Sequence, residues 1–157
     1  MRVMVRGPSI FHPLSRFLAG AVAVVLLCFA SGAFAKPARV SAGDWRVIQA
    51  VISKQMQAFR LDDGEEAFAL ASPGIRQVFE SADSFMEMVR TEYSAVYRPR
   101  TFRFLKPAVL EGEPVQPVEV VALDGAMSIA VFSMERQPNR SWRISGCRLI
   151  ESKQFAI

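Results

Sequence analysis

Apolar residues in the first half of the chain recur at helical spacing. Four of them lie three, four and seven positions apart, which marks one face of a helix: Trp45, Ile48, Ile52 and Phe59. Asp44 precedes the first of these residues and is a good N-cap, so the pattern predicts a helix from about residue 45 to 61. Gln55 falls mostly off the apolar face.

Three further helical segments follow this helix. A second helix is predicted over residues 65–71, and Ser72-Pro73-Gly74 ends it because proline lacks an N–H and restricts the residue before it. Ile75, Val78 and Phe79 indicate one short helical turn. A third helix, capped by Asp83 or Ser84, is predicted to end near Ser94 or Tyr97.

After Pro99 the pattern changes to alternation, which is typical of strands. Asp124-Gly125 is a strong hairpin signal, and Pro117 is expected at a bulge or an edge. Residues 108–112 are expected to continue the first strand or to pair with it. The other predicted strands cover residues 101–105, 114–123, 126–135 and 141–152. The fold class is therefore α+β, with N-terminal helices packed on a curved antiparallel sheet of about four strands.

Residues 1–35 have the order of a secretory signal peptide. Arginines precede an apolar run from Leu18 to Phe29, and Ala33 and Ala35 then occupy the small-residue positions of a cleavage site. The run is too short to span a bilayer, although an uncleaved N-terminal anchor is the alternative. We expect a flexible segment over residues 36–43 and a single domain over residues 44–157. The expected location is the periplasm or outside the cell, with membrane contact only through an uncleaved leader.

Cleavage also changes the charge. Three of the 19 basic residues and none of the 15 acidic residues lie in the leader, so 16 basic residues face 15 acidic ones in the mature chain. A nucleic-acid-binding protein is expected to show a basic excess, so that class is excluded. The only histidine, His12, also lies in the leader. Histidine-dependent nucleophilic catalysis is therefore excluded, and we expect neither a metal nor a cofactor.

Five residues, Asp62 to Glu66, contain four carboxylates around Gly64. Calcium loops need oxygens that alternate over about twelve residues, and these acids are adjacent instead. Asp62 or Asp63 can cap the following helix, and Glu65 and Glu66 suit its first turn, where the helix dipole favours negative charge. Helix capping is therefore the favoured interpretation. Whether Asp62 instead points into a pocket is left open.

The helices followed by a curved sheet resemble the cone-shaped nuclear-transport-factor-2-like (cystatin-like) architecture. The run from Trp45 to Phe104, the strand VQPVEV and the closing WRISGCRL resemble the DUF4864 family of small exported bacterial proteins of unknown function. This resemblance covers about Trp45 to Leu149. It implies a compact exported domain, and it implies no activity, ligand or catalytic residue.

The cone-fold resemblance implies a catalytic alternative. Some cone-fold enzymes combine an acidic base with a tyrosine that stabilises an oxyanion, which makes Asp62, Tyr93 and Tyr97 the candidate catalytic residues here. The alternative is that both tyrosines simply pack with a solvated hydroxyl. Fold does not imply function, so the residue types alone do not decide between these readings.

Binding candidates lie elsewhere in the chain. Arg98, Arg100 and Arg103 stand among aromatic residues and are candidates for anion binding; the alternative is a solvated loop and strand face. Aromatic residues first suit the core, but a curved sheet can leave some of them lining a ligand cavity. The ligand-binding candidates of this kind are Trp45, Phe59, Phe104 and Trp142.

Cys147 is the one cysteine expected in the mature chain. Strict alternation places Cys147 and Leu149 on one strand face, and Trp142, Ile144 and Arg148 on the other. A neighbouring arginine would lower the thiol pKa, whereas a buried structural cysteine would be inert. The second reading is favoured, because no partner cysteine or histidine supports redox or nucleophilic work.

The favoured function is therefore non-catalytic binding of a small ligand or an envelope protein partner. The two alternatives are a cofactor-free enzyme that uses a carboxylate and a tyrosine, and a structural protein that self-associates through its sheet, for example as a homodimer.

Overall fold

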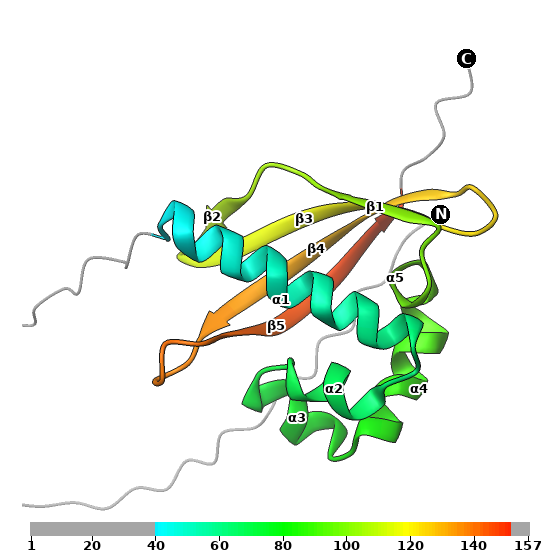
Figure 1. Cartoon of the computed structure of the whole chain (residues 1–157), viewed down its shortest axis with the longest axis horizontal. Coiled ribbons are helices and arrows are strands. Elements are labelled where there is room, and N and C mark those ends of the chain that lie inside the picture. The colour runs from blue at the N-terminus through cyan, green and yellow to red at the C-terminus, as the bar shows by residue number, and fades with distance from the viewer. Residues whose placement is uncertain (1–39, 152–157) are drawn as a thin grey trace, which may run out of the picture. The chain divides into compact units, whose positions relative to one another are not determined.

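In the computed structural model of the protein, residues 40–151 of the 157-residue chain are described. The predicted leader, with Ala33 and Ala35, lies outside these residues, as do residues 36–39 of the predicted flexible segment 36–43. The last two residues of that segment, Ala42 and Gly43, are helical, so the prediction was wrong for them. Within the described part, helices come first and antiparallel strands follow (Figure 1). The predicted α+β class is therefore confirmed.

Helix α1 (Ala42–Arg60) begins three residues earlier than the apolar pattern indicated. Its N-cap is Ser41, whose hydroxyl accepts a hydrogen bond from the backbone N–H of Asp44 at 3.0 Å. The Asp44 carboxylate in turn accepts from the Ser41 backbone N–H at 3.0 Å, which completes a capping box. The prediction of Asp44 as the N-cap was wrong, because this residue is the third helical position of the box.

Four short helices follow, and most are capped by a side chain. Asp63 caps α2, as one of the two predicted alternatives. Ser72 caps α3, with Pro73 in its first turn, where a missing N–H costs nothing. Ser81, rather than the predicted Asp83 or Ser84, caps α4. These helices are α2 (Gly64–Ala69), α3 (Pro73–Phe79), α4 (Ala82–Glu92) and α5 (Ser94–Tyr97), so the predicted third helix is divided at Tyr93.

The sheet has five strands in the order β1-β3-β4-β5, and β2 also pairs with β3. Strands β1 and β2 lie one after the other along the same edge of β3, so β2 is the addition to the four predicted strands. The Asp124-Gly125 hairpin between β3 and β4 is confirmed, with Gly125 at a φ of 88°. The strands are β1 (Thr101–Phe104), β2 (Ala108–Leu110), β3 (Glu113–Val121), β4 (Met127–Arg136) and β5 (Trp142–Glu151).

Pro117 explains why the β3 edge carries two strands instead of one. Its carbonyl accepts a hydrogen bond from the Leu105 N–H at 2.9 Å, but proline has no N–H to return to the Leu105 carbonyl. The buried Gln116 side chain donates to that carbonyl instead, at 2.7 Å. The neighbouring strand is therefore interrupted between Phe104 and Ala108, opposite the proline.

A β-bulge in β5 changes which residues face the helices. The pairing with β4 shifts after Met134, which pairs with Ile144, to Ser133, which pairs with Gly146, so Ser145 is the extra residue. Trp142 and Ile144 before the bulge are buried, and Cys147 and Leu149 after it also pack against the core. The predicted division of these four residues between two faces was wrong, because a bulge reverses the alternation.

The core lies between α1 and one face of the sheet. Helix α1 crosses this face, and α2, α3 and α4 gather beyond the β5 edge (Figure 1). The centre of the core is built from fully buried side chains of α1, β3 and β4: Ile48, Ile52, Met56, Val118, Val120, Ala130, Phe132 and Met134. Among residues 40–151, no helix covers the other face of the sheet. The cone-shaped architecture remains a prediction.

Candidate functional site

A cleft of about 680 Å³ lies between α3, α4 and the second half of β5. Volumes of about 300–1,000 Å³ are usual for small-molecule sites. Helix α1 contributes Gln55 and Phe59, and the loop after α4 contributes Tyr93. The remaining lining comes from α3, α4, α5, β4 and the β5 stretch 144–149.

Aromatic rings form one wall of this cleft. Phe85 of α4 stands at the centre, with its ring centroid 6.1 Å from that of Phe59 and 5.7 Å from that of Phe79. Phe68 approaches the same ring from α2, at 5.4 Å. Offset and tilted pairs of this kind contribute about 0.5–1.5 kcal/mol each beyond burial, so the wall is held rigid. Phe59 is the one predicted ligand-binding aromatic that the structure places in the cleft.

Few polar groups face the cleft. Gln55 is only 3% exposed, and its amide nitrogen donates to the Ala67 carbonyl at 3.0 Å. No described residue donates to its amide oxygen, which leaves one acceptor beside the cleft. Glu92 and Arg148, both exposed, bring one charge of each sign. The prediction that Gln55 lies mostly off the buried face was wrong, because α2 packs against that side of α1.

Tyr93 lines the cleft, and its hydroxyl donates to the Cys147 carbonyl at 3.0 Å. Burial, together with the nearby Cys147 and Glu92, raises the pKa of the Tyr93 phenol above its ordinary value of 10.0. This tyrosine is therefore a neutral hydrogen-bonding group at neutral pH. Asp62 and Tyr97 do not line the cleft. The structure brings these two predicted catalytic residues together in a hydrogen bond and leaves Tyr93 in the cleft without them.

Cys147 also lines the cleft, as a free cysteine. Burial raises the pKa of its thiol to about 12. Arg148, on the opposite face of β5, is exposed and does not offset this effect. The thiol is therefore protonated at neutral pH. The favoured interpretation, an inert structural cysteine, stays a prediction.

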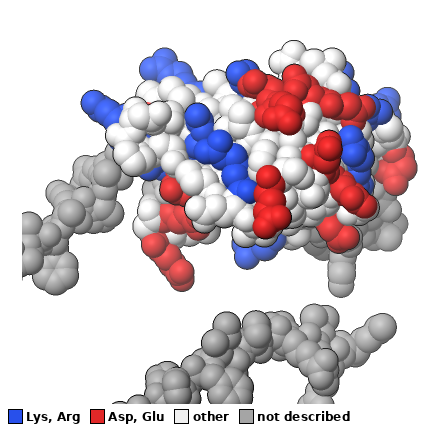
Figure 2. All heavy atoms as spheres, turned by 90° about the horizontal axis from the view of Figure 1, so that it is seen from below, with Lys and Arg blue, Asp and Glu red and all other residues white. Residues whose placement is uncertain are grey.

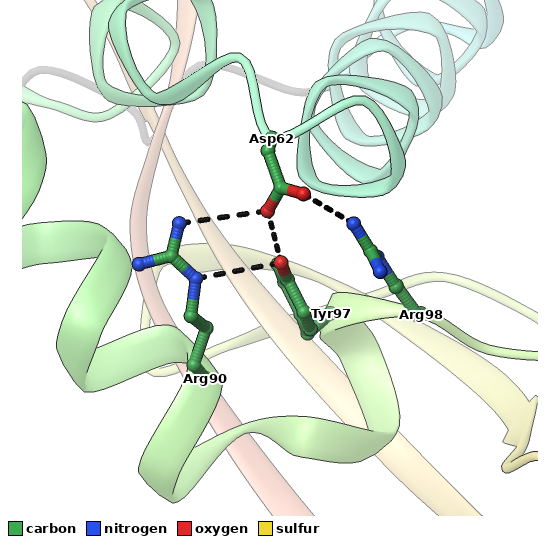
Figure 3. A network of polar contacts seen from close by, with 4 residues as sticks. All are labelled: Asp62, Arg90, Tyr97 and Arg98. Carbon is green, nitrogen blue, oxygen red and sulfur yellow. Dashed lines mark hydrogen bonds and ion pairs between the residues drawn. The ribbon is translucent and has the colours of Figure 1, made fainter.

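Asp62 neither caps a helix nor enters the cleft. It has a positive φ of 56° at the turn between α1 and α2, and its carboxylate faces α4 and α5 (Figure 3). The Tyr97 hydroxyl and the Arg98 guanidinium donate to it, and Arg90 lies 3.5 Å away. These groups, Tyr97 first and then Arg98, hold the pKa of Asp62 below its ordinary value. A general base that works near pH 7 needs a raised pKa. This cluster is therefore better explained as surface contacts that join the turn after α1 to α4 and α5.

The three candidate anion-binding arginines occupy different surroundings. Arg98 pairs with Asp62 and lies 4.9 Å from the centroid of the Tyr97 ring. Arg103 pairs with Glu119 across β1 and β3, at 3.0 Å. Arg100 is exposed and bonds β3 through its backbone N–H. On the face drawn in Figure 2, acidic and basic side chains are interspersed, and neither sign dominates.

The remaining aromatic candidates lie away from the cleft. Trp45 and Phe104 are partly buried against the core. Trp142 is buried at the other end of the sheet, where its indole N–H donates to Asp44 at 3.2 Å and Arg136 lies over its ring. Trp142 lines a separate hollow of about 490 Å³ with Val40, Glu113 and Arg136.

Two kinds of site find no support in the part of the chain that the structure describes. No three His, Cys, Asp or Glu side chains there are grouped closely enough to hold a metal ion. None of the described helices has the length and apolar character that a membrane span requires.

Comparison with known proteins gives one match. Residues 42–157 match the model of a family described as "Domain of unknown function (DUF4864)". No curated protein and no solved structure matches the chain.

Proposed function

Because the chain belongs to the DUF4864 family, whose description assigns no function, we propose its function from the geometry: non-catalytic binding of an apolar group in the cleft between α3, α4 and β5. One observation carries this proposal. The cleft has the size of a ligand site, an aromatic wall and few polar groups, which is the usual composition of a binding pocket. The leader motif supports placing this activity in the periplasm or outside the cell.

The enzyme alternative finds less support. Its candidate base is Asp62, whose side chain is about two-fifths exposed and is bonded to Tyr97 and Arg98 outside the cleft. Within the cleft, the Tyr93 hydroxyl is already engaged with a backbone carbonyl. Acid and base catalysis at pH 7 needs a group that titrates near that pH, and the pKa values of Tyr93 and Cys147, both in the lining, are raised away from it.

Binding of a neutral apolar dye, N-phenyl-1-naphthylamine, tests the proposal. Its fluorescence rises on transfer from water to an apolar site, so titration reports the affinity. Ile75 lines the cleft, whereas Val78 on the same helix is 74% exposed and does not line it. We expect Ile75→Arg to weaken binding by at least about tenfold and Val78→Arg to leave it unchanged, because only the first charge enters the apolar site.

Equal binding by both variants and the unaltered protein would place the dye elsewhere and remove the proposal. Circular dichroism and urea unfolding of each variant show whether Ile75→Arg has kept its fold. If it has not, Met88→Gln is the replacement, because Met88 also lines the cleft and glutamine conserves helix propensity.

A second candidate, self-association through the sheet, is favoured by the face that the described helices leave uncovered. Five apolar side chains alternate with the buried ones there, beside the polar Glu119, Ser133 and Arg148: Val121, Met127, Ile129, Val131 and Ile150. Sedimentation equilibrium of the unaltered chain and of Val131→Glu tests this candidate. A dimer that this substitution dissociates supports it, and a monomer at all concentrations rejects it.

A further inference from the structure

The cleft runs along an unpaired edge of the sheet. Strand β5 is the last in the order β1-β3-β4-β5, so one of its edges pairs with β4 and the other is free. The chain covers the first part of this free edge itself. The Ile144 N–H donates to the Leu70 carbonyl at 3.1 Å, and the Ser72 N–H donates to the Ile144 carbonyl at 2.8 Å.

The pairing register identifies the next free groups. The Ala122 N–H donates to the Ala126 carbonyl, so even-numbered residues of β4 turn their peptide groups toward β3 and odd-numbered residues turn theirs toward β5. The β5 partners of the odd-numbered residues are Gly146, Arg148 and Ile150. The peptide groups of Cys147 and Leu149 therefore face the free edge.

Among residues 40–151, the Tyr93 hydroxyl on the Cys147 carbonyl is the one group that bonds this part of the edge. The N–H groups of Cys147 and Leu149 and the carbonyl of Leu149 have no partner in that range. Natural proteins usually block such edges, because unpaired peptide groups are a template for another strand. Here the edge is covered at Ile144 and uncovered beside the cleft.

Cys147 and Leu149 also line the cleft. A ligand in the cleft therefore meets apolar side chains and a row of unpaired backbone donors and acceptors together. A small apolar molecule satisfies only the first of these. An extended peptide satisfies both, because its backbone pairs with the edge while alternate side chains enter the pocket.

We propose that the occupant of the cleft is an extended segment of a partner polypeptide, which adds a strand to β5 at Cys147 and Leu149 and inserts apolar side chains against α3 and α4. The proposal rests on the proposed function and specifies its ligand. A second copy of this chain fits less well, because pairing two identical β5 edges adds no side chains that fill either cleft.

N-methylated peptides test the backbone pairing. Capped peptides of about six residues, the usual length of a strand, are arrayed with alternating apolar and polar positions, and the best binder is measured by fluorescence polarisation. Its amides are then methylated at alternate positions in two complementary sets. We expect one set to lower the affinity by about tenfold or more and the other to have little effect, because only one set faces β5.

The protein side of the same pairing is tested at Leu149. Leu149→Pro removes the N–H that faces the free edge and keeps the β4 ladder, since proline is tolerated where a strand N–H faces outward. Leu149→Ala removes more of the side chain's contacts than Leu149→Pro does, but it keeps the backbone N–H. We expect the proline variant to lose peptide binding more strongly than the alanine variant, while circular dichroism and urea unfolding show that each variant is folded.

Each of the following results would overturn the inference. Equal effects of the two methylated sets, or equal losses in the two Leu149 variants, would show that backbone pairing is absent. The dye could bind, and Ile75→Arg could block it, while no arrayed peptide binds. This result would leave the proposed function standing and remove the peptide as its ligand. A dimer that Leu149→Pro dissociates would assign the edge to a second copy. If the unaltered protein does not bind the dye, both proposals are removed together.

Discussion

Two aspartates show how single residues join segments that are distant in the sequence. Asp44 closes the capping box of α1 and also accepts from the Trp142 indole, 98 residues later. Asp62 joins the α1–α2 turn to Tyr97 and Arg98. The sequence predicted caps in both regions, because capping depends on neighbours within one helical turn. It could not predict the distant partners, which depend on how the helices pack.

Replacement of Asp44 by asparagine should lower the stability at neutral pH. Hydrogen bonds from Ser41 and then from Trp142 lower the pKa of this carboxyl from 3.8 to about 2. A depressed folded-state pKa contributes stability above pH about 4, and this contribution is lost as the pH falls toward about 2. Urea unfolding should therefore show a deficit for Asp44→Asn at pH 7 that disappears near pH 2.

Glu87→Gln is the matched control, since the Glu87 carboxylate is exposed in the middle of α4 and has no ion pair or hydrogen bond among the described residues. Its unfolding midpoint should stay close to that of the unaltered protein at both pH values. A deficit for Asp44→Asn that is constant with pH would contradict the assignment of its stability to the ionised carboxylate.

Cys147 should react slowly in the folded protein. Cys147 is half-buried, and burial raises the pKa of its thiol to about 12, so the thiolate fraction at pH 7.5 is negligible. In a chain with Cys28 replaced by serine, a chromogenic disulfide reagent should label native protein much more slowly than protein in urea. The same rate in both states would show that the thiol is accessible.

At the scale of elements, periodicity predicted the helices and strands to within a few residues. Two departures have local physical causes. The bulge at Ser145 reverses the side-chain alternation. Gly146 beside it is the local signal that could have indicated a bulge, because glycine inside a strand often marks one. The β1–β2 interruption follows from Pro117, whose position at an edge or bulge was predicted, although the role of Gln116 was not.

Gln116→Leu should destabilise the sheet by about 1–3 kcal/mol, because the Leu105 carbonyl loses its donor in a partly buried position. Pro117→Val supplies a backbone N–H that points at the same carbonyl. The double variant should therefore recover part of the loss, whereas Pro117→Val alone should change stability little. Urea unfolding of the four proteins forms a double-mutant cycle, and strictly additive effects would show that the two residues do not share this role.

At the scale of the molecule, the cleft is assembled from seven segments that span residues 55 to 149. Of the predicted site residues, only Phe59 and Tyr93 line it, and Cys147 joins them. Gln55, Ile75 and Met88 were missed, because helical spacing identifies an apolar face and does not show whether another element covers it. The candidate site therefore followed from the packing of α3 and α4 beside β5, which no local pattern encodes.

The most direct test of the central claim is a ¹H–¹⁵N correlation titration of the isotope-labelled protein with N-phenyl-1-naphthylamine. If the cleft is the binding site, the shifted amides should lie in α3, in α4 and at residues 145–149. The amide chemical shifts of Glu119 and Ile129 should not change, because the side chains of these residues lie on the opposite face of the sheet. Shifts centred on Ile129 and Val131, with α3 and α4 unchanged, would contradict the account and move the binding surface to the uncovered face.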